Sequence, residues 1–190
     1  MENDRRTRRT KKLLTDAFIE LLFSKKLNEI TVKELCDKAD INRGTFYLHY
    51  TDIYDMKQQL ENDICQQFEE IISKTSPKVD FSTSYAITLK LFHLIQEHSL
   101  LLKAFLGPNG DISFSQKMQT IFKERYLRII LQGQPPANQK KLNYSYSFVA
   151  SGFTGLVVSW LNEENPTPIE EMAMFITKLL FNGLPSLIIL

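Results

Sequence analysis

Residues 31–50 read TVKELCDKADINRGTFYLHY, and this stretch decides the expected fold. Thr31 followed by Glu34 is a capping-box pattern, which predicts a helix that begins directly after Thr31. An apolar stripe at helical spacing follows, formed by Val32, Leu35, Cys36 and Ala39. Asn42 is a good N-cap for another short helix that begins at Arg43. The stretch therefore predicts two short helices around a tight turn, which is the helix-turn-helix arrangement.

The second of these helices carries several aromatic rings together with many polar atoms. In a helix-turn-helix, the second helix conventionally enters the major groove of DNA. Phe46 and Leu48 are expected to pack inward. Gly44 lets the backbone approach DNA closely, and Arg43 has the fork that suits guanine or a phosphate. The helix N-terminus at Thr31 also favours a phosphate. The predicted DNA-contacting residues of this stretch are Thr31, Asn42, Arg43, Gly44, Thr45, Tyr47, His49 and Tyr50.

Charge is distributed unevenly along the 190-residue chain, whose formal net charge is +1. Residues 1–50 hold 11 Lys/Arg against 8 Asp/Glu, while the remainder of the chain is slightly acidic. The first twelve residues hold a basic arm of Arg5, Arg6, Arg8, Arg9, Lys11 and Lys12. Such an arm can hold phosphates, although like-charge runs are often simply solvated. Arg8 and Arg9 are taken as further candidate DNA contacts.

Helical signals continue on both sides of the decisive stretch. Apolar residues from Leu13 to Leu22 predict a first helix over residues 6–24, and Asp52 is expected to cap a long fourth helix. Further helices are expected over residues 83–97, 98–106, 113–132, 138–163 and 167–183. No alternating strand pattern is visible, so the predicted fold is all-α. We expect a helix-turn-helix DNA-binding domain in residues 1–51, followed by a helical ligand-binding and dimerisation domain in residues 52–190.

Residues 31–56 resemble the DNA-binding signature of the tetracycline-repressor (TetR/AcrR) family of bacterial transcription regulators. The matching features include Thr31, Arg43-Gly44-Thr45, Tyr47 and His49, in the family's order and spacing. Two positions depart from the pattern: Asp40 replaces the usual glycine, and Ile53 replaces a frequent lysine. Asp tolerates the left-handed backbone conformation better than most residues, so the turn should survive. The Ile53 departure puts one charged phosphate contact in doubt.

This resemblance implies a ligand-responsive repressor that binds a pseudo-palindromic operator as a homodimer. Small residues four apart, Ser151 and Gly155, permit close helix approach and favour a dimer surface on the last two helices. The expected interface residues are Phe148, Ser151, Gly152, Gly155, Leu156, Trp160, Met172, Phe175, Ile176 and Leu179. The resemblance also implies a pocket for an unknown small-molecule effector in the middle helices. Its candidate lining residues are Tyr85, Leu89, Phe92, His93, Phe105, Phe122, Tyr126 and Tyr144.

Other classes of function are less well supported by the sequence. Serine-hydrolase, zinc-protease, P-loop and dinucleotide motifs are missing, so no enzyme activity and no cofactor are expected. The histidines His93 and His98 are poorly spaced for a metal site. Two cysteines without a CxxC pattern suggest a reducing compartment, and no apolar run is long enough for a bilayer. A cytoplasmic protein is therefore expected. The alternatives are an activator or co-activator of the same fold, and a helical ligand-binding module without DNA.

Overall fold

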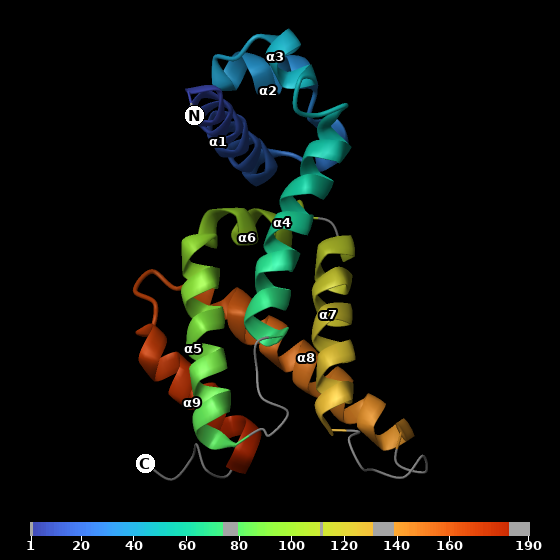
Figure 1. The fold of residues 1–190 in the computed structure, drawn as a ribbon, viewed down its shortest axis with the longest axis vertical. Coiled ribbons are helices and arrows are strands. Elements are labelled where there is room, and N and C mark those ends of the chain that lie inside the picture. Colours follow the sequence, from blue (N-terminus) through green and yellow to red (C-terminus); the bar gives the residue numbers. More distant parts are fainter. Residues whose placement is uncertain (1, 74–79, 111, 131–138, 183–190) are drawn as a thin grey trace. The chain divides into compact units, whose positions relative to one another are not determined.

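A computed structural model of the chain describes residues 2–73, 80–110, 112–130 and 139–182. Its elements are helices throughout the described residues, which confirms the predicted all-α class (Figure 1). The expected helices form, and their ends differ from the predicted ones by a few residues. The helices are α1 Glu2–Ser24, the 3-10 turn η1 Leu27–Glu29, α2 Val32–Ala39, α3 Arg43–Tyr47, α4 Ile53–Ser73, α5 Phe81–Glu97, α6 Ser99–Leu106, α7 Ile112–Ile130, α8 Gln139–Asn162 and α9 Ile169–Asn182.

The chain divides into two compact units, and the first contains the helix-turn-helix. Unit 1 consists of Met1–Ile64 together with Leu100–Phe114, so α6 belongs to it although α6 lies far along the sequence. In this unit α1 packs on α2 and α2 packs on α3. The apolar stripes predicted for these helices meet in one core, whose fully buried members include Leu14, Phe18, Leu35, Phe46 and Met56.

Unit 2 consists of Cys65–Ser99 and Ser115–Leu190, and in it α5 packs against α9. Phe92 of α5 is fully buried, and its ring centroid lies 5.2 Å from that of Trp160 in α8. The indole Nε1 of Trp160 donates a 2.7 Å hydrogen bond to the carbonyl of Thr167, just before α9. This bond fixes the connection between the last two helices. Among the described helices, none combines the length and apolar character needed to cross a membrane.

Candidate nucleic-acid interface

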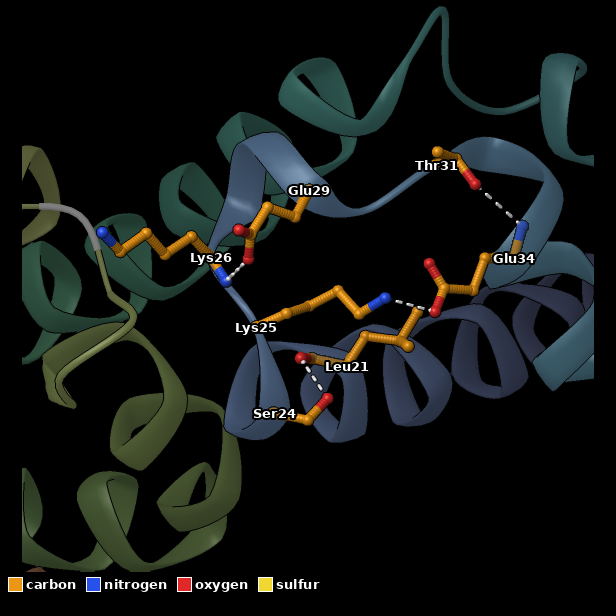
Figure 2. A network of polar contacts seen from close by, with 7 residues as sticks. All are labelled: Leu21, Ser24, Lys25, Lys26, Glu29, Thr31 and Glu34. Carbon is orange, nitrogen blue, oxygen red and sulfur yellow. Dashed lines mark hydrogen bonds and ion pairs between the residues drawn. The ribbon is translucent and has the colours of Figure 1, made fainter.

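Both helices of the helix-turn-helix begin with a side-chain cap. The Thr31 hydroxyl accepts a 3.2 Å hydrogen bond from the backbone N–H of Glu34, and Thr31 is the N-cap of α2 (Figure 2). Asn42 Oδ1 accepts a 2.8 Å bond from the N–H of Gly44 at the start of α3. A helix N-terminus leaves backbone N–H groups without carbonyl partners, and these caps satisfy one in each helix. The predicted starts of both helices are confirmed.

The predicted capping box at Thr31 forms only by half. Figure 2 shows that the Glu34 carboxylate does not return to Thr31 but pairs with Lys25, whose Nζ lies 2.5 Å from Glu34 Oε1. An ammonium group is a stronger partner for a carboxylate than a neutral backbone N–H. The ion pair therefore ties α2 to the end of α1. A reciprocal cap forms instead one turn earlier, where Glu29 Oε2 accepts from the N–H of Lys26 at 3.0 Å.

Asp40 makes the turn between α2 and α3 in a left-handed backbone conformation, with φ 53° and ψ 45°. The N–H of the next residue, Ile41, donates a 3.0 Å bond back to the carbonyl of Cys36. This closes the end of α2 in the manner of a left-handed helix cap. The expectation that the turn survives without glycine is confirmed.

The exposed face of α3 presents polar side chains opposite a buried anchor. Phe46 is fully buried, as predicted, whereas Arg43, Gly44 and Tyr47 are exposed. Thr45 is half-buried. A Cβ atom at Gly44 would lie 3.2 Å from Asn42 Oδ1, so a side chain at this position would crowd the cap as well as the outer face. The half-buried His49 follows the end of α3.

Two residues of the predicted recognition segment have the opposite orientation from that expected. Tyr50, predicted at the surface, is 3% exposed, and its ring centroid lies 5.5 Å from that of Phe46. Burial raises the pKa of Tyr50 to about 12. Leu48, predicted to pack inward, is 80% exposed. The short helix turns Phe46 into the core, which leaves Leu48 outside, and the chain then folds Tyr50 back against Phe46.

The basic arm is helical rather than extended, because α1 begins at Glu2. Arg8 and Arg9 are both exposed, and their helical spacing places them away from the buried Thr10 and Leu14. Lys11 points elsewhere, with its Nζ 5.7 Å from the centroid of the Tyr50 ring. The basic arm is therefore an exposed helical segment at the start of α1.

One exposed aromatic near this region was missed by sequence reasoning. Tyr54, in the first turn of α4, is 57% exposed, whereas its neighbour Ile53 is buried. The apolar stripe of α4 includes Ile53 and Met56, and Tyr54 lies outside it. Its position outside the apolar stripe is the sequence signal that indicates its exposure. Like the exposed Tyr47, Tyr54 offers a phenol hydroxyl at the surface.

The predicted effector-pocket residues do not form one group. Tyr85, Leu89 and Phe122 are half-buried in unit 2 with the buried Phe92, but Phe105 packs on Phe114 in unit 1, at a centroid distance of 5.1 Å. His93 and Tyr144 are exposed, and the side chain of Tyr126 lies outside the described residues. Phe105 does not join the other pocket residues because α6 belongs to unit 1. His93 and Tyr144 lie on the exposed faces of their helices.

Phe153 of α8, absent from the predicted pocket, joins the rings that do come together. Its ring centroid lies 6.1 Å from that of Phe92 and 5.7 Å from that of Phe122. Phe122 in turn lies 6.1 Å from Phe68 of α4. The rings form a chain through unit 2, supplied by α4, α5, α7 and α8. Sequence spacing within one helix carries no signal for such a contact between helices.

The predicted dimer residues divide into an exposed stripe and a buried group. The stripe follows α8 at helical spacing and consists of Phe148, Ser151, Gly152 and Gly155. Phe148 is 76% exposed, and a Cβ atom built at either glycine meets nothing within 4 Å. Phe175 of α9 is also exposed, and Leu156 and Leu179 are half-buried. Three of the expected interface residues are instead buried within the single chain, namely Trp160, Met172 and Ile176.

Comparison with known proteins assigns this arrangement to a family. A TetR C-terminal family model, described as a transcriptional regulator C-terminal region, matches residues 82–182. The chain is 26% identical over 171 residues to the HTH-type transcriptional regulator YxbF of Bacillus subtilis (strain 168), covering 90% of this chain and 44% of that protein. It thus spans less than half of that relative's length.

Solved structures share the fold. A TetR transcriptional regulator from Streptococcus agalactiae aligns with a TM-score of 0.61 and 20% identity, covering 95% of this chain and 98% of that one. The regulator FadR from Bacillus subtilis, solved in complex with stearoyl-CoA, aligns with a TM-score of 0.64 and 14% identity over 91% of this chain and 98% of that one.

Proposed function

The chain belongs to the TetR family of transcriptional regulators, and from that premise we propose that it is a ligand-responsive repressor that binds a pseudo-palindromic operator as a homodimer. The exposed outer face of α3 carries the proposal. Arg43 and Tyr47 are held outward there because Phe46 is fully buried. A guanidinium and a phenol suit base edges and phosphate oxygens respectively.

The two capped helix starts supply phosphate donors. The Thr31 hydroxyl accepts from Glu34, so its own proton can donate to a phosphate oxygen. The Asn42 amide uses its oxygen for the cap, and its N–H₂ group carries the donors. Thr31 also has the positive end of the α2 helix dipole behind it. Contacts of this kind fix the orientation of the protein on DNA without reading sequence.

Useful sequence specificity requires two copies of this short reader. Two-fold dimers place two such helices about 34 Å apart on successive major grooves. The exposed α8 stripe supports a dimer, because Ser151, Gly152 and Gly155 present almost no side-chain bulk beside the exposed Phe148. We place the protein in the cytoplasm on the same proposal, with DNA as its partner there.

An apolar effector fits the interior of unit 2 best. The described buried polar side chains of this unit are Ser84, Thr88 and Thr177. The Thr88 and Thr177 hydroxyls already donate to carbonyls of their own helices, at 2.9 and 2.7 Å. Among the described residues of unit 2, a charged ligand group would find few buried polar partners, and a buried charge needs a partner. FadR, which shares this fold, was solved in complex with stearoyl-CoA, a ligand that carries an apolar acyl chain, and this supports the proposal of an apolar effector.

Selection of duplexes from a random library with the 190-residue chain tests the proposal. Binding to the selected duplex is then measured by fluorescence anisotropy at several salt concentrations. A steep loss of affinity with salt is expected, because phosphate contacts release counterions. Arg43→Ala should weaken binding and reduce the salt slope if the guanidinium contacts a phosphate, whereas Lys90→Ala on α5 serves as the charge-matched control. The proposal fails if the folded wild-type protein retains no duplex in dilute buffer.

A further inference from the structure

Leu48 is the most exposed of the large hydrophobic side chains in the described residues, at 80%. It does not belong to a loose tail. Its backbone is helical, with φ −73° and ψ −18°, and its N–H donates a 3.3 Å bond to the carbonyl of Thr45. The side chain is therefore held in a defined direction at the end of α3, although water surrounds an apolar group.

Leu48 follows the buried Phe46 by two positions, so it lies on the side of the helix away from the core, where Gly44 and Tyr47 are also exposed. Residues four apart are neighbours on a helix surface, so Leu48 lies next to Gly44. Gly44 is exposed and has no side chain, so it adds no bulk beside Leu48. Phe46 points to the opposite side, into the core. The outer face thus carries one apolar side chain, Leu48, beside the polar groups of Thr45 and Tyr47.

The apolar side chain of Leu48 limits the groups of DNA that it can contact favourably. Its side chain can neither donate to a phosphate nor form a hydrogen bond with a base. In the major groove, the apolar group that distinguishes one base pair from the others is the C5-methyl group of thymine. We propose that Leu48 contacts a thymine C5-methyl group in each operator half-site and so determines base preference at that position. This inference rests on the proposed DNA-binding function.

Thr45 is the internal competitor for this contact, because its side chain also carries a methyl group. It is half-buried, whereas Leu48 projects fully from the face. The two can be separated by matched variants: Leu48→Ala removes the exposed methyl groups, and Thr45→Ser removes the threonine methyl but retains the hydroxyl. Both changes leave the buried Phe46 in place, and circular dichroism checks that each variant is folded.

Replacement of thymine by deoxyuridine in the selected operator tests the contact, since it removes the methyl group and keeps every hydrogen-bonding atom. Each thymine is replaced in turn, symmetrically in both half-sites. Wild-type protein should lose affinity at one such position, by about fourfold for each methyl group removed. Leu48→Ala should bind the thymine operator more weakly and show no further loss with deoxyuridine there. Thr45→Ser should keep the wild-type sensitivity.

The outcomes separate this inference from the function on which it rests. If wild-type protein binds the operator but no thymine position responds to deoxyuridine, Leu48 reads no methyl group. The inference also fails if Leu48→Ala keeps the full response, or if Thr45→Ser abolishes it instead. Failure of wild-type protein to bind any duplex overturns the proposed function itself.

Discussion

The side-chain amide of Asn109 donates a 3.1 Å hydrogen bond to the carbonyl oxygen of Leu22, 87 positions earlier in the chain. The same Nδ2 atom lies 3.4 Å from the carbonyl of Phe23. The last carbonyls of a helix have no donor within the helix, so Asn109 caps the end of α1 from outside. The turn between α6 and α7 is thereby fastened within unit 1.

Asn109→Asp should therefore destabilise the protein, because it replaces the donor with an acceptor facing two carbonyl oxygens. A loss of about 1–3 kcal/mol is expected for buried or half-buried groups left without a partner. Chemical denaturation followed by circular dichroism measures it. Asn165→Asp makes the same change at an exposed loop residue and should be neutral. Equal stability of the two variants would show that the cap contributes nothing.

A buried ion pair on α4 gives the second prediction. Lys57 Nζ lies 2.7 Å from Glu61 Oε1 and donates a 3.0 Å bond to Ser113 Oγ at the start of α7. Removal of one charge of such a pair typically costs about 3–5 kcal/mol, because the other stays buried. Lys57→Met should thus destabilise severely, and the double variant Lys57→Met/Glu61→Leu should recover much of the loss.

Breaking an exposed ion pair is the control for that experiment. Lys38 and Glu20 lie 2.6 Å apart at the surface of unit 1. Lys38→Met should cost no more than about 1 kcal/mol, as exposed pairs generally do. Thermal melting of the three variants beside wild type makes the comparison. Similar losses for Lys57→Met and Lys38→Met would argue against a special role for the buried pair.

Asp40 stands in a backbone conformation that glycine adopts at no steric cost. For other L-residues the left-handed conformation costs roughly 1–2 kcal/mol, with less for Asp. Asp40→Gly should therefore raise stability by about 0.5–1 kcal/mol, offset in part by the greater freedom of glycine in the unfolded chain. Asp40→Val should lower it. Melting temperatures should rank the glycine variant above wild type and the valine variant last; the reverse order contradicts the assigned turn.

Tyr50 gives the protein a predicted sensitivity to alkali. Burial raises the pKa of its phenol from 10.0 to about 12. The folded state therefore keeps the proton that the unfolded state loses, so this stabilisation is present below pH 10 and disappears as the pH rises through about 12. Stability measured from pH 8 to 12 should fall less in Tyr50→Phe than in wild type. Tyr146 also has a pKa raised by burial to about 12, so part of the slope should remain.

The α8 stripe predicts a variant that separates association from folding. Gly155→Glu places a charge where a Cβ meets nothing within 4 Å, so the single chain should accommodate it. Replacing a helical glycine should even stabilise the helix by about 0.5–1 kcal/mol. Sedimentation velocity should show that the variant is a monomer, and circular dichroism should show that it is folded. Fluorescence anisotropy should show that it has lost tight DNA binding. Ala86→Glu, on the exposed face of α5, should remain dimeric; an unchanged dimer in Gly155→Glu would place the interface elsewhere.

The sequence predicted an interaction correctly where both of its partners lie within a few residues of each other in the chain. The caps at Thr31 and Asn42 and the left-handed Asp40 each involve atoms within a few residues. Such interactions are decided by the side chain and the adjacent backbone alone. The same reasoning failed for Glu34, whose partner Lys25 lies nine residues earlier in the chain, just after the end of α1.

The sequence by itself determined the helices, their capped starts and the signature of a helix-turn-helix, because these follow from short-range spacing. Tertiary structure decided which ring of the recognition segment is buried, turning Tyr50 inward and leaving Leu48 exposed. A helix of little more than one turn has too few positions to define a face by itself. Packing against neighbouring helices supplies the missing direction, and it also placed Phe105 of α6 in the core of unit 1.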